Sequence, residues 1–229
     1  MKNKQLNMTQ NEYIKLSNDL QQLAKIIPLQ WGNIQNDGTD NQINMFQIHS
    51  FEELETQISS LSDNSKNYFR RRWFLWKCAQ CDEYIFCTNT NVTPNPNTRD
   101  QGYDIEFNNN NLLRFDIKGT VIPREFRNDI NAILNDPTKM INFYYEKQST
   151  GVRNNIQNRL FIVHHSYRNQ DREMYLRCHW AFKLNLYKTY SEKINSNSNF
   201  FNFQTAKADV IFIFENLDRT ITHSFFAIQ

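Results

Sequence analysis

The chain contains few of the residues that interrupt helices and strands or form disulfide bonds. Among 229 residues there are 5 glycines, 5 prolines and 4 cysteines. So few cysteines in a chain of this length do not make a disulfide scaffold, and we expect a reduced, cytoplasmic protein. The longest clean apolar run is 210–214, far short of the roughly 18 residues of a membrane span, and the first 13 residues lack the apolar segment of a signal peptide.

Strong charge of either sign is also missing. Lys and Arg number 26 against 24 Asp and Glu, giving a net charge of +2. This excludes a highly cationic, histone-like protein and an acidic tail, so any charge that binds nucleic acid must be local. No period of 20 to 50 residues recurs, and the length predicts one domain: a helical part over 1–62 and a core over 63–229.

Asparagine is the abundant residue, with 32 copies. The high polarity of the chain could suggest disorder. Its 18 Phe, 10 Tyr and 4 Trp exclude this, because disordered chains are poor in aromatics. We interpret most of the excess as the coding bias of an AT-rich genome, which places Asn at surfaces and turns.

Helical signals dominate the first third of the chain. Thr9 with Glu12, and Ser50 with Glu53, form two capping boxes that predict helices over 9–27 and from 50 to about 61. A longer helix is predicted over 65–86, with Asp63 as its cap.

Strands and helices then alternate. The Pro- and Asn-rich stretch 88–101 predicts a loop without regular structure, and 196–204 a second loop. A β-hairpin is expected over 103–107 and 112–121, helix over 124–147 with a break at Asp136-Pro137, and buried strands at 160–164 and 208–214. Residues 171–193 have helical character, and the candidates for their buried side are Met174, Trp180, Leu184 and Leu186. This order predicts an α/β (α+β) fold with a mixed central sheet flanked by helices.

The hairpin carries the chemistry. Alternate residues of a strand share a face, so the apolar sets of the two strands must be paired on one side. The residue numbers of two facing partners then add up to 220: Ile105 faces Phe115, Glu106 faces Arg114, and Phe107 faces Leu113. On the opposite face, Asp104 meets Asp116, with Lys118 two residues further on.

Two aspartates at this separation repel each other unless a positive charge intervenes. Mg²⁺ prefers carboxylate oxygens and retains several waters, and Lys118 stands where it can orient or deprotonate such a water. The pattern therefore favours metal-assisted hydrolysis of a phosphodiester. The competing interpretation is that the hairpin charges are simply solvated.

The layout resembles the PD-(D/E)xK nuclease superfamily, the fold of many type II restriction endonucleases. Asp104 and the sequence Asp116-Ile117-Lys118 match its motif, although Tyr103 replaces the proline. The resemblance covers about 63–165. It implies a restriction-endonuclease-like fold and Mg²⁺-dependent cleavage of double-stranded DNA by a homodimer, with no membrane partner.

The resemblance also implies roles for single residues. Asp104 and Asp116 would bind the metal together with the Ile117 carbonyl, Lys118 would act on the attacking water, and Glu83 would be an accessory acid. The candidates for DNA contact lie in the flanking loops: Arg99, Arg124, Arg127, Arg153, Asn155 and Arg159.

Two questions stay open at this point. Cys78 and Cys81 have the spacing of a zinc knuckle, but no second close pair follows, so packing on a helix is the favoured interpretation. The alternatives to an endonuclease are a non-catalytic nucleic-acid-binding protein or defence-complex subunit on the same fold, and a structural protein whose hairpin charges are solvated.

Overall fold

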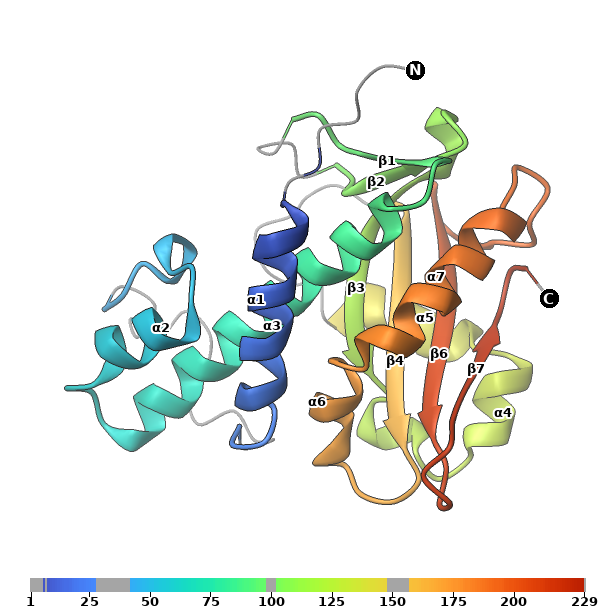
Figure 1. The fold of residues 1–229 in the computed structure, drawn as a ribbon. Helices are drawn as coiled ribbons and strands as arrows, with labels where there is room; N and C mark the ends of the chain where they lie inside the picture. Colours follow the sequence, from blue (N-terminus) through green and yellow to red (C-terminus); the bar gives the residue numbers. More distant parts are fainter. Residues whose placement is uncertain (1–5, 7, 28–41, 98–101, 148–156, 229) are drawn as a thin grey trace.

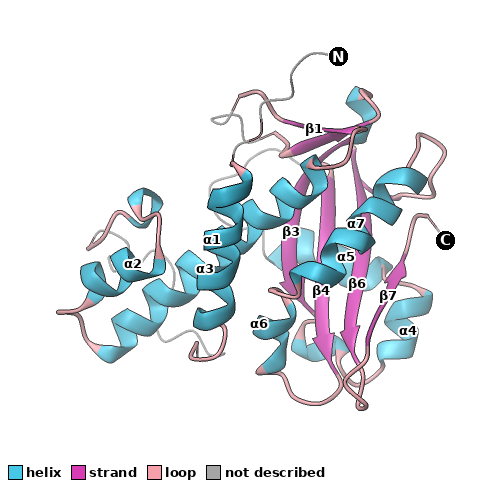
Figure 2. Cartoon of the chain, viewed as in Figure 1, coloured by secondary structure: helices cyan, strands magenta, loops and turns pink. Residues whose placement is uncertain are grey.

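Strand pairing organises the molecule. A computed structural model describes residues 6, 8–27, 42–97, 102–147 and 157–228. Within these residues seven strands form one mixed sheet in the order β1-β2-β3-β4-β6-β5, with β7 also paired to β6 (Figures 1 and 2). The strands are β1 (Val92–Pro94), β2 (Ile105–Phe107), β3 (Arg114–Val121), β4 (Arg159–Ser166), β5 (Phe201–Phe203), β6 (Ala206–Glu215) and β7 (Ile221–Phe225). Strands β3, β4 and β6 run parallel and the other pairs are antiparallel.

Helices cover both faces of this sheet (Figure 1). The α-helices are α1 (Gln10–Leu23), α2 (Phe51–Ile58), α3 (Asp63–Cys87), α4 (Ile130–Asn135), α5 (Thr138–Lys147), α6 (Arg172–Leu176) and α7 (Trp180–Lys193). Short 3₁₀ turns lie at η2 (Met45–Gln47), η3 (Asn111–Leu113) and η4 (Arg124–Phe126). The predicted mixed α/β fold is confirmed. No described helix has both the length and the apolar composition needed to cross a membrane.

The parallel strands separate two hydrophobic clusters because their side chains alternate. On one face, Ile117, Ile162 and Ile211 pack with α1, α3 and α7. On the other face, Phe161 and Val210 pack with α4 and α5. Both faces are therefore buried, which explains why the sequences of β4 and β6 are almost continuously apolar.

The helix caps agree largely with the sequence. Thr9 and Glu12 form the predicted capping box of α1. Ser50 caps α2, but the Glu53 carboxylate accepts from the N–H of His49 at 2.8 Å instead of completing the box. The cap predicted at Asp63 is wrong: Ser62 accepts from the Ser65 N–H and Asp63 is the first residue of α3.

Three other local predictions are wrong. Strands β1 and β5 lie inside segments predicted as loops, and Pro94 belongs to β1 because that strand is at the sheet edge, where a missing N–H is tolerated. Leu184, predicted to be inward, is 43% exposed. Residues 171–193 divide into α6 and α7, while the predicted break before Thr138 is confirmed.

The hairpin register is the predicted one. Ile105 pairs with Phe115 and Glu106 with Arg114. The β2–β3 ladder ends there, and the predicted pairing of Phe107 with Leu113 is wrong because Leu113 belongs to η3. On the other side of β2, Phe107 pairs with Val92 of β1.

Asp209 of β6 is a fully buried carboxyl group. It accepts hydrogen bonds from the Tyr190 hydroxyl (2.6 Å) and the N–H groups of Val210 (2.7 Å) and Ala227 (2.8 Å). Burial outweighs these bonds and raises the pKa of Asp209 to about 6. The folded protein thus holds this proton more tightly than the unfolded chain does.

We expect Asp209 to make the protein less stable as pH rises from about 4 through about 6, by about 3 kcal/mol. Asp209→Asn should remove that part of the decline, as measured by urea unfolding across this pH range. Exposed Asp171, replaced by Asn, is the matched control. An unchanged pH dependence in Asp209→Asn would contradict this account.

Candidate functional site

Asp104 is held in place by backbone hydrogen bonds at the start of β2. Its N–H donates to the Phe115 carbonyl (2.9 Å), and its own carbonyl accepts from the N–H of Asn95 (2.9 Å). Its carboxylate reaches across to β3, where Oδ2 accepts from the Ile117 N–H at 2.7 Å. The hairpin register thus fixes the carboxyl group beside the Asp116-Ile117-Lys118 segment.

Asp116 lies on β3 between two cations. Lys118 Nζ is 2.7 Å from Oδ1, and Arg159 Nε of β4 is 3.7 Å from Oδ2. The Asp116 side chain is only 4% exposed, whereas that of Lys118 is 37% exposed. Asp116 and Arg159 are direct partners in the β3–β4 ladder, so the parallel pairing sets this contact.

Electrostatics show that the two aspartates share one site. Burial first, and then the negative charge of Asp116, raise the pKa of Asp104 to about 6. The Ile117 N–H and the Lys118 ammonium act in the opposite direction. Two carboxyl groups with this mutual repulsion favour a cation or a shared proton between them.

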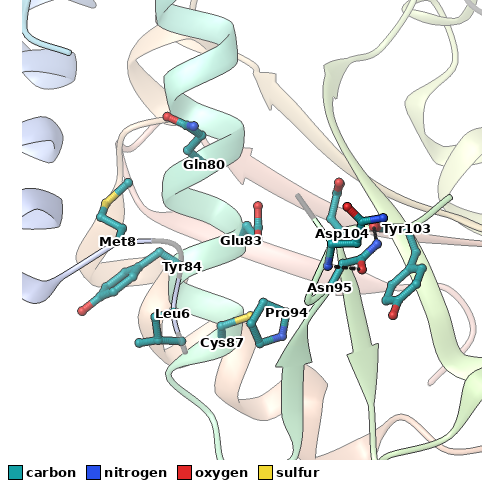
Figure 3. Close-up of a pocket in the computed structure, with 11 residues that line it drawn as sticks. Leu6, Met8, Gln80, Glu83, Tyr84, Cys87, Pro94, Asn95, Tyr103 and Asp104 are labelled. Atoms are coloured by element: carbon teal, nitrogen blue, oxygen red, sulfur yellow. Dashed lines mark hydrogen bonds between the residues drawn. The ribbon is translucent and has the colours of Figure 1, made fainter. Parts of the chain in front are cut away.

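A cavity of about 290 Å³ opens beside Asp104 (Figure 3). One wall is α3, with Gln80, Glu83 and Tyr84, and the other includes Tyr103 and Asp104 at the hairpin. Glu83 and Asp104 therefore face one pocket from different elements. Asp116 and Lys118 adjoin it through the Asp104–Asp116 contact but do not line it.

The donor set fits Mg²⁺ in chemistry. Among the residues that the structure describes, no three His, Cys, Asp or Glu side chains gather in a group that could hold a metal ion. Asp104 and Asp116 form a pair, and Mg²⁺ is commonly bound by one or two carboxylates, with water and substrate phosphate completing its shell. The contact made by Ile117 runs through its N–H, whereas the resemblance assigned the role to its carbonyl.

Three of the six predicted DNA-contact residues, Arg124, Arg127 and Arg159, lie within the described part of the chain. Arg99, Arg153 and Asn155 lie outside the described residues. Arg124 is exposed but follows the far end of β3, whose last residue, Val121, lies five residues or roughly 16 Å beyond Asp116.

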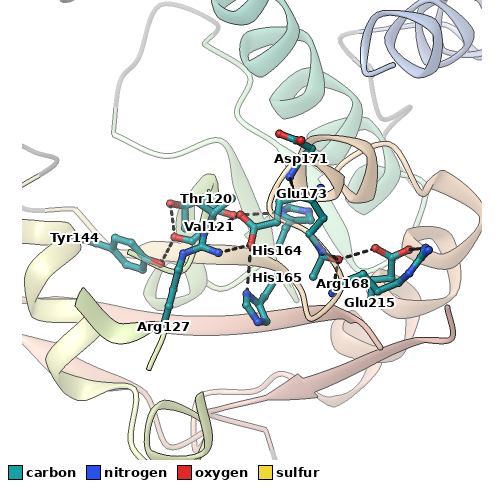
Figure 4. Close-up of polar contacts among 12 residues, drawn as sticks. Thr120, Val121, Arg127, Tyr144, His164, His165, Arg168, Asp171, Glu173 and Glu215 are labelled. Atoms are coloured by element: carbon teal, nitrogen blue, oxygen red, sulfur yellow. Dashed lines mark hydrogen bonds and ion pairs between the residues drawn. The ribbon is translucent and has the colours of Figure 1, made fainter. Parts of the chain in front are cut away.

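Arg127 and Arg159 both form contacts with acidic residues of the same chain. Arg127 forms a bidentate ion pair with Glu173 (2.7 and 2.8 Å) at the carboxyl ends of the parallel strands (Figure 4). Arg159 is buried, lies 4.8 Å from the Tyr145 ring and contacts Asp116. Its position suits it to support the carboxylate, and DNA contact by these residues stays a prediction.

All four cysteines are buried thiols. Cys78 Sγ lies 4.0 Å from Cys178 Sγ, between α3 and the segment before α7. Burial raises the pKa of Cys81 and Cys178 well above the ordinary value, so these thiols stay protonated and pack as apolar groups.

Two asparagines that support the site were not identified from the sequence. The Asn158 side chain donates to the Arg114 carbonyl (3.1 Å) and accepts from the Lys207 N–H (2.8 Å), and its carbonyl accepts from Asp116 (3.0 Å). Asn95 donates from Nδ2 to the Tyr103 carbonyl at 2.9 Å. In a chain with 32 asparagines, no local signal distinguishes these two.

Comparison of the chain with protein-family models, with curated proteins and with solved structures finds no match.

Burial, together with the repulsion from Asp116, predicts that a neutral side chain at position 104 stabilises the metal-free protein. A raised carboxyl pKa costs stability above about pH 6 and costs nothing below the unfolded value near 4. Asp104→Asn keeps an acceptor for the Ile117 N–H, and we expect a gain on the order of 1 kcal/mol, or about 2 to 4 °C in Tm, near pH 8.

Thermal unfolding with EDTA at about pH 8 and about pH 4 measures this effect, with Asp171→Asn as the exposed control. The gain should vanish at the lower pH. A variant less stable than the parent protein at both values would contradict a raised pKa of Asp104 in the folded protein.

Proposed function

We propose that the chain is a Mg²⁺-dependent endonuclease that hydrolyses phosphodiester bonds in double-stranded DNA, of the type II restriction kind. The observation that carries this proposal is the Asp104–Asp116–Lys118 arrangement. A buried carboxyl group (Asp116) and a half-buried one (Asp104) lie beside one partly exposed ammonium group. Arrangements with this electrostatic cost are concentrated at functional sites.

In this proposal Asp104 and Asp116 would hold Mg²⁺, which supplies charge stabilisation at the scissile phosphate and a more acidic water. Lys118 Nζ, now 2.7 Å from Asp116, orients the attacking water or takes its proton. The buried guanidinium group of Arg159, with Nε 3.7 Å from Asp116 Oδ2, offsets part of the negative charge of that carboxylate. Glu83 serves as the accessory acid across the pocket.

The order of elements supports the same interpretation. Helix α3, which carries Glu83, precedes the hairpin with the two aspartates, and α4, α5 and the parallel strand β4 follow. This order is compatible with the fold that the sequence resemblance implies for 63–165. Cutting both DNA strands is simplest with two copies related by a two-fold axis, so we also propose a homodimer.

One observation favours a second candidate. Asp116 already contacts two cations of its own chain, Lys118 and Arg159, and this pairing would also suit a site that never binds a metal. A non-catalytic nucleic-acid-binding protein or defence-complex subunit on this fold is therefore the alternative. It predicts DNA binding that is unaffected by EDTA and no strand breaks.

Incubation of supercoiled plasmid DNA with Mg²⁺ or with EDTA tests the proposal. We expect cleavage only with Mg²⁺, and Asp116→Asn should reduce its rate by more than the roughly 100-fold that loss of an outer-shell partner costs. The amide keeps the side-chain shape, so Arg159 and Lys118 retain an acceptor.

Asp171→Asn serves as the control and should cut at the parental rate, and thermal unfolding should show that both variants fold. Undiminished cleavage by folded Asp116→Asn, or no Mg²⁺-dependent cleavage by the parent protein, would refute the proposal.

A further inference from the structure

The pocket beside Asp104 has a polar end and an apolar end (Figure 3). Glu83, Tyr103 and Asp104 lie at the polar end, next to the aspartate pair. Met8 and Tyr84 lie at the other end. A ligand that fills the pocket would therefore place polar atoms beside Glu83 and Asp104 and a flat or apolar group beside Met8 and Tyr84.

The charge of the described lining residues disfavours a phosphate inside the pocket. The described residues that line it include two acids, Glu83 and Asp104, and no Lys or Arg. An anion would be repelled there, while Lys118 stands just outside, beside Asp116. If the scissile phosphate lies at the aspartates, the part of the substrate that enters the pocket is uncharged.

Two aromatic rings are held in place at this cavity. Tyr84 is stacked on Tyr13, with ring centroids 4.7 Å apart and planes 21° apart, and Tyr103 lies under the Arg114 guanidinium at 4.7 Å. Preset rings form stacking platforms for nucleobases. The volume of about 290 Å³ is at the small end of ligand pockets and suits one base. Gln80 provides an amide for hydrogen bonds to a base edge.

We propose that this pocket receives the unstacked base of the nucleotide whose phosphate is cut. The inference rests on the proposed nuclease function and adds a preference among duplex substrates: cleavage is faster where the nucleotide at the cut is unpaired or mismatched. A base must leave the helix to enter the pocket, which costs a few kcal/mol in paired DNA and least where the base is already unpaired.

Closed circular DNA with one single-nucleotide bulge, compared with the fully paired circle, tests this inference. With Mg²⁺, the full-length protein should cut the bulged circle about tenfold faster or more, at the phosphate adjoining the extra nucleotide. Equal rates, or cuts unrelated to the bulge, would overturn the inference and leave the nuclease proposal intact. Cleavage of neither circle would overturn both.

A pocket-filling variant tests the location. Gln80→Trp on the partly exposed side of α3 places an indole in the cavity and should abolish the preference for the bulge. Gln57→Trp, on the exposed side of α2, is the matched control and should keep it. Tyr84→Leu, checked for folding by its Tm because it loses the Tyr13 stack, should weaken the preference. A tenfold preference that survives in Gln80→Trp would show that the base does not bind there.

Discussion

Side-chain alternation in the β2–β3 hairpin is the constraint on which the site depends. Ile105 and Phe115 are fully buried on one face, and a one-residue slip would expose both apolar sets. The same register places Asp104 and Asp116 next to each other on the other face. Hydrophobic burial therefore enforces an electrostatic repulsion, and the Ile117 N–H and the cations of Lys118 and Arg159 offset it.

This constraint explains which parts of the fold were predictable. Strands β4 and β6 follow from short, continuous apolar runs, the hairpin register from side-chain alternation, and α1 from its capping box, because local pattern and burial agree there. Strands β1 and β5 are three residues each and exist because longer neighbours pair with them. Such edge strands depend on tertiary contacts, so composition alone suggested loops. The prediction that Leu184 is buried was wrong because several faces of the helix fitted the apolar pattern.

The residues of the candidate site also differ in whether local sequence predicts their contacts. Asp104, Asp116 and Lys118 come together through local parity, which the sequence contains. Arg159 reaches Asp116 because β4 aligns in parallel with β3, and no local pattern specifies the register of strands joined by two intervening helices. The sequence therefore suggested DNA contact for an arginine that is buried against the carboxylate.

Asparagine takes the place of the scarce glycine at the turn of the hairpin. Left-handed backbone at the hairpin falls on Asn108 and Asn109, with φ of 57° and 50°, residues that tolerate it better than most. The Asn108 amide also donates to the Ile194 carbonyl after α7 (2.9 Å), and that of Asn91 donates to Ser191 (2.7 Å). Helix α7 holds α3 too, through Lys183 Nζ and Asp82 Oδ1 at 2.7 Å, one residue before Glu83. Both walls of the pocket are thus fixed by one helix far away in the sequence, so the separation of Glu83 and Asp104 is a property of the assembled fold and not of either motif.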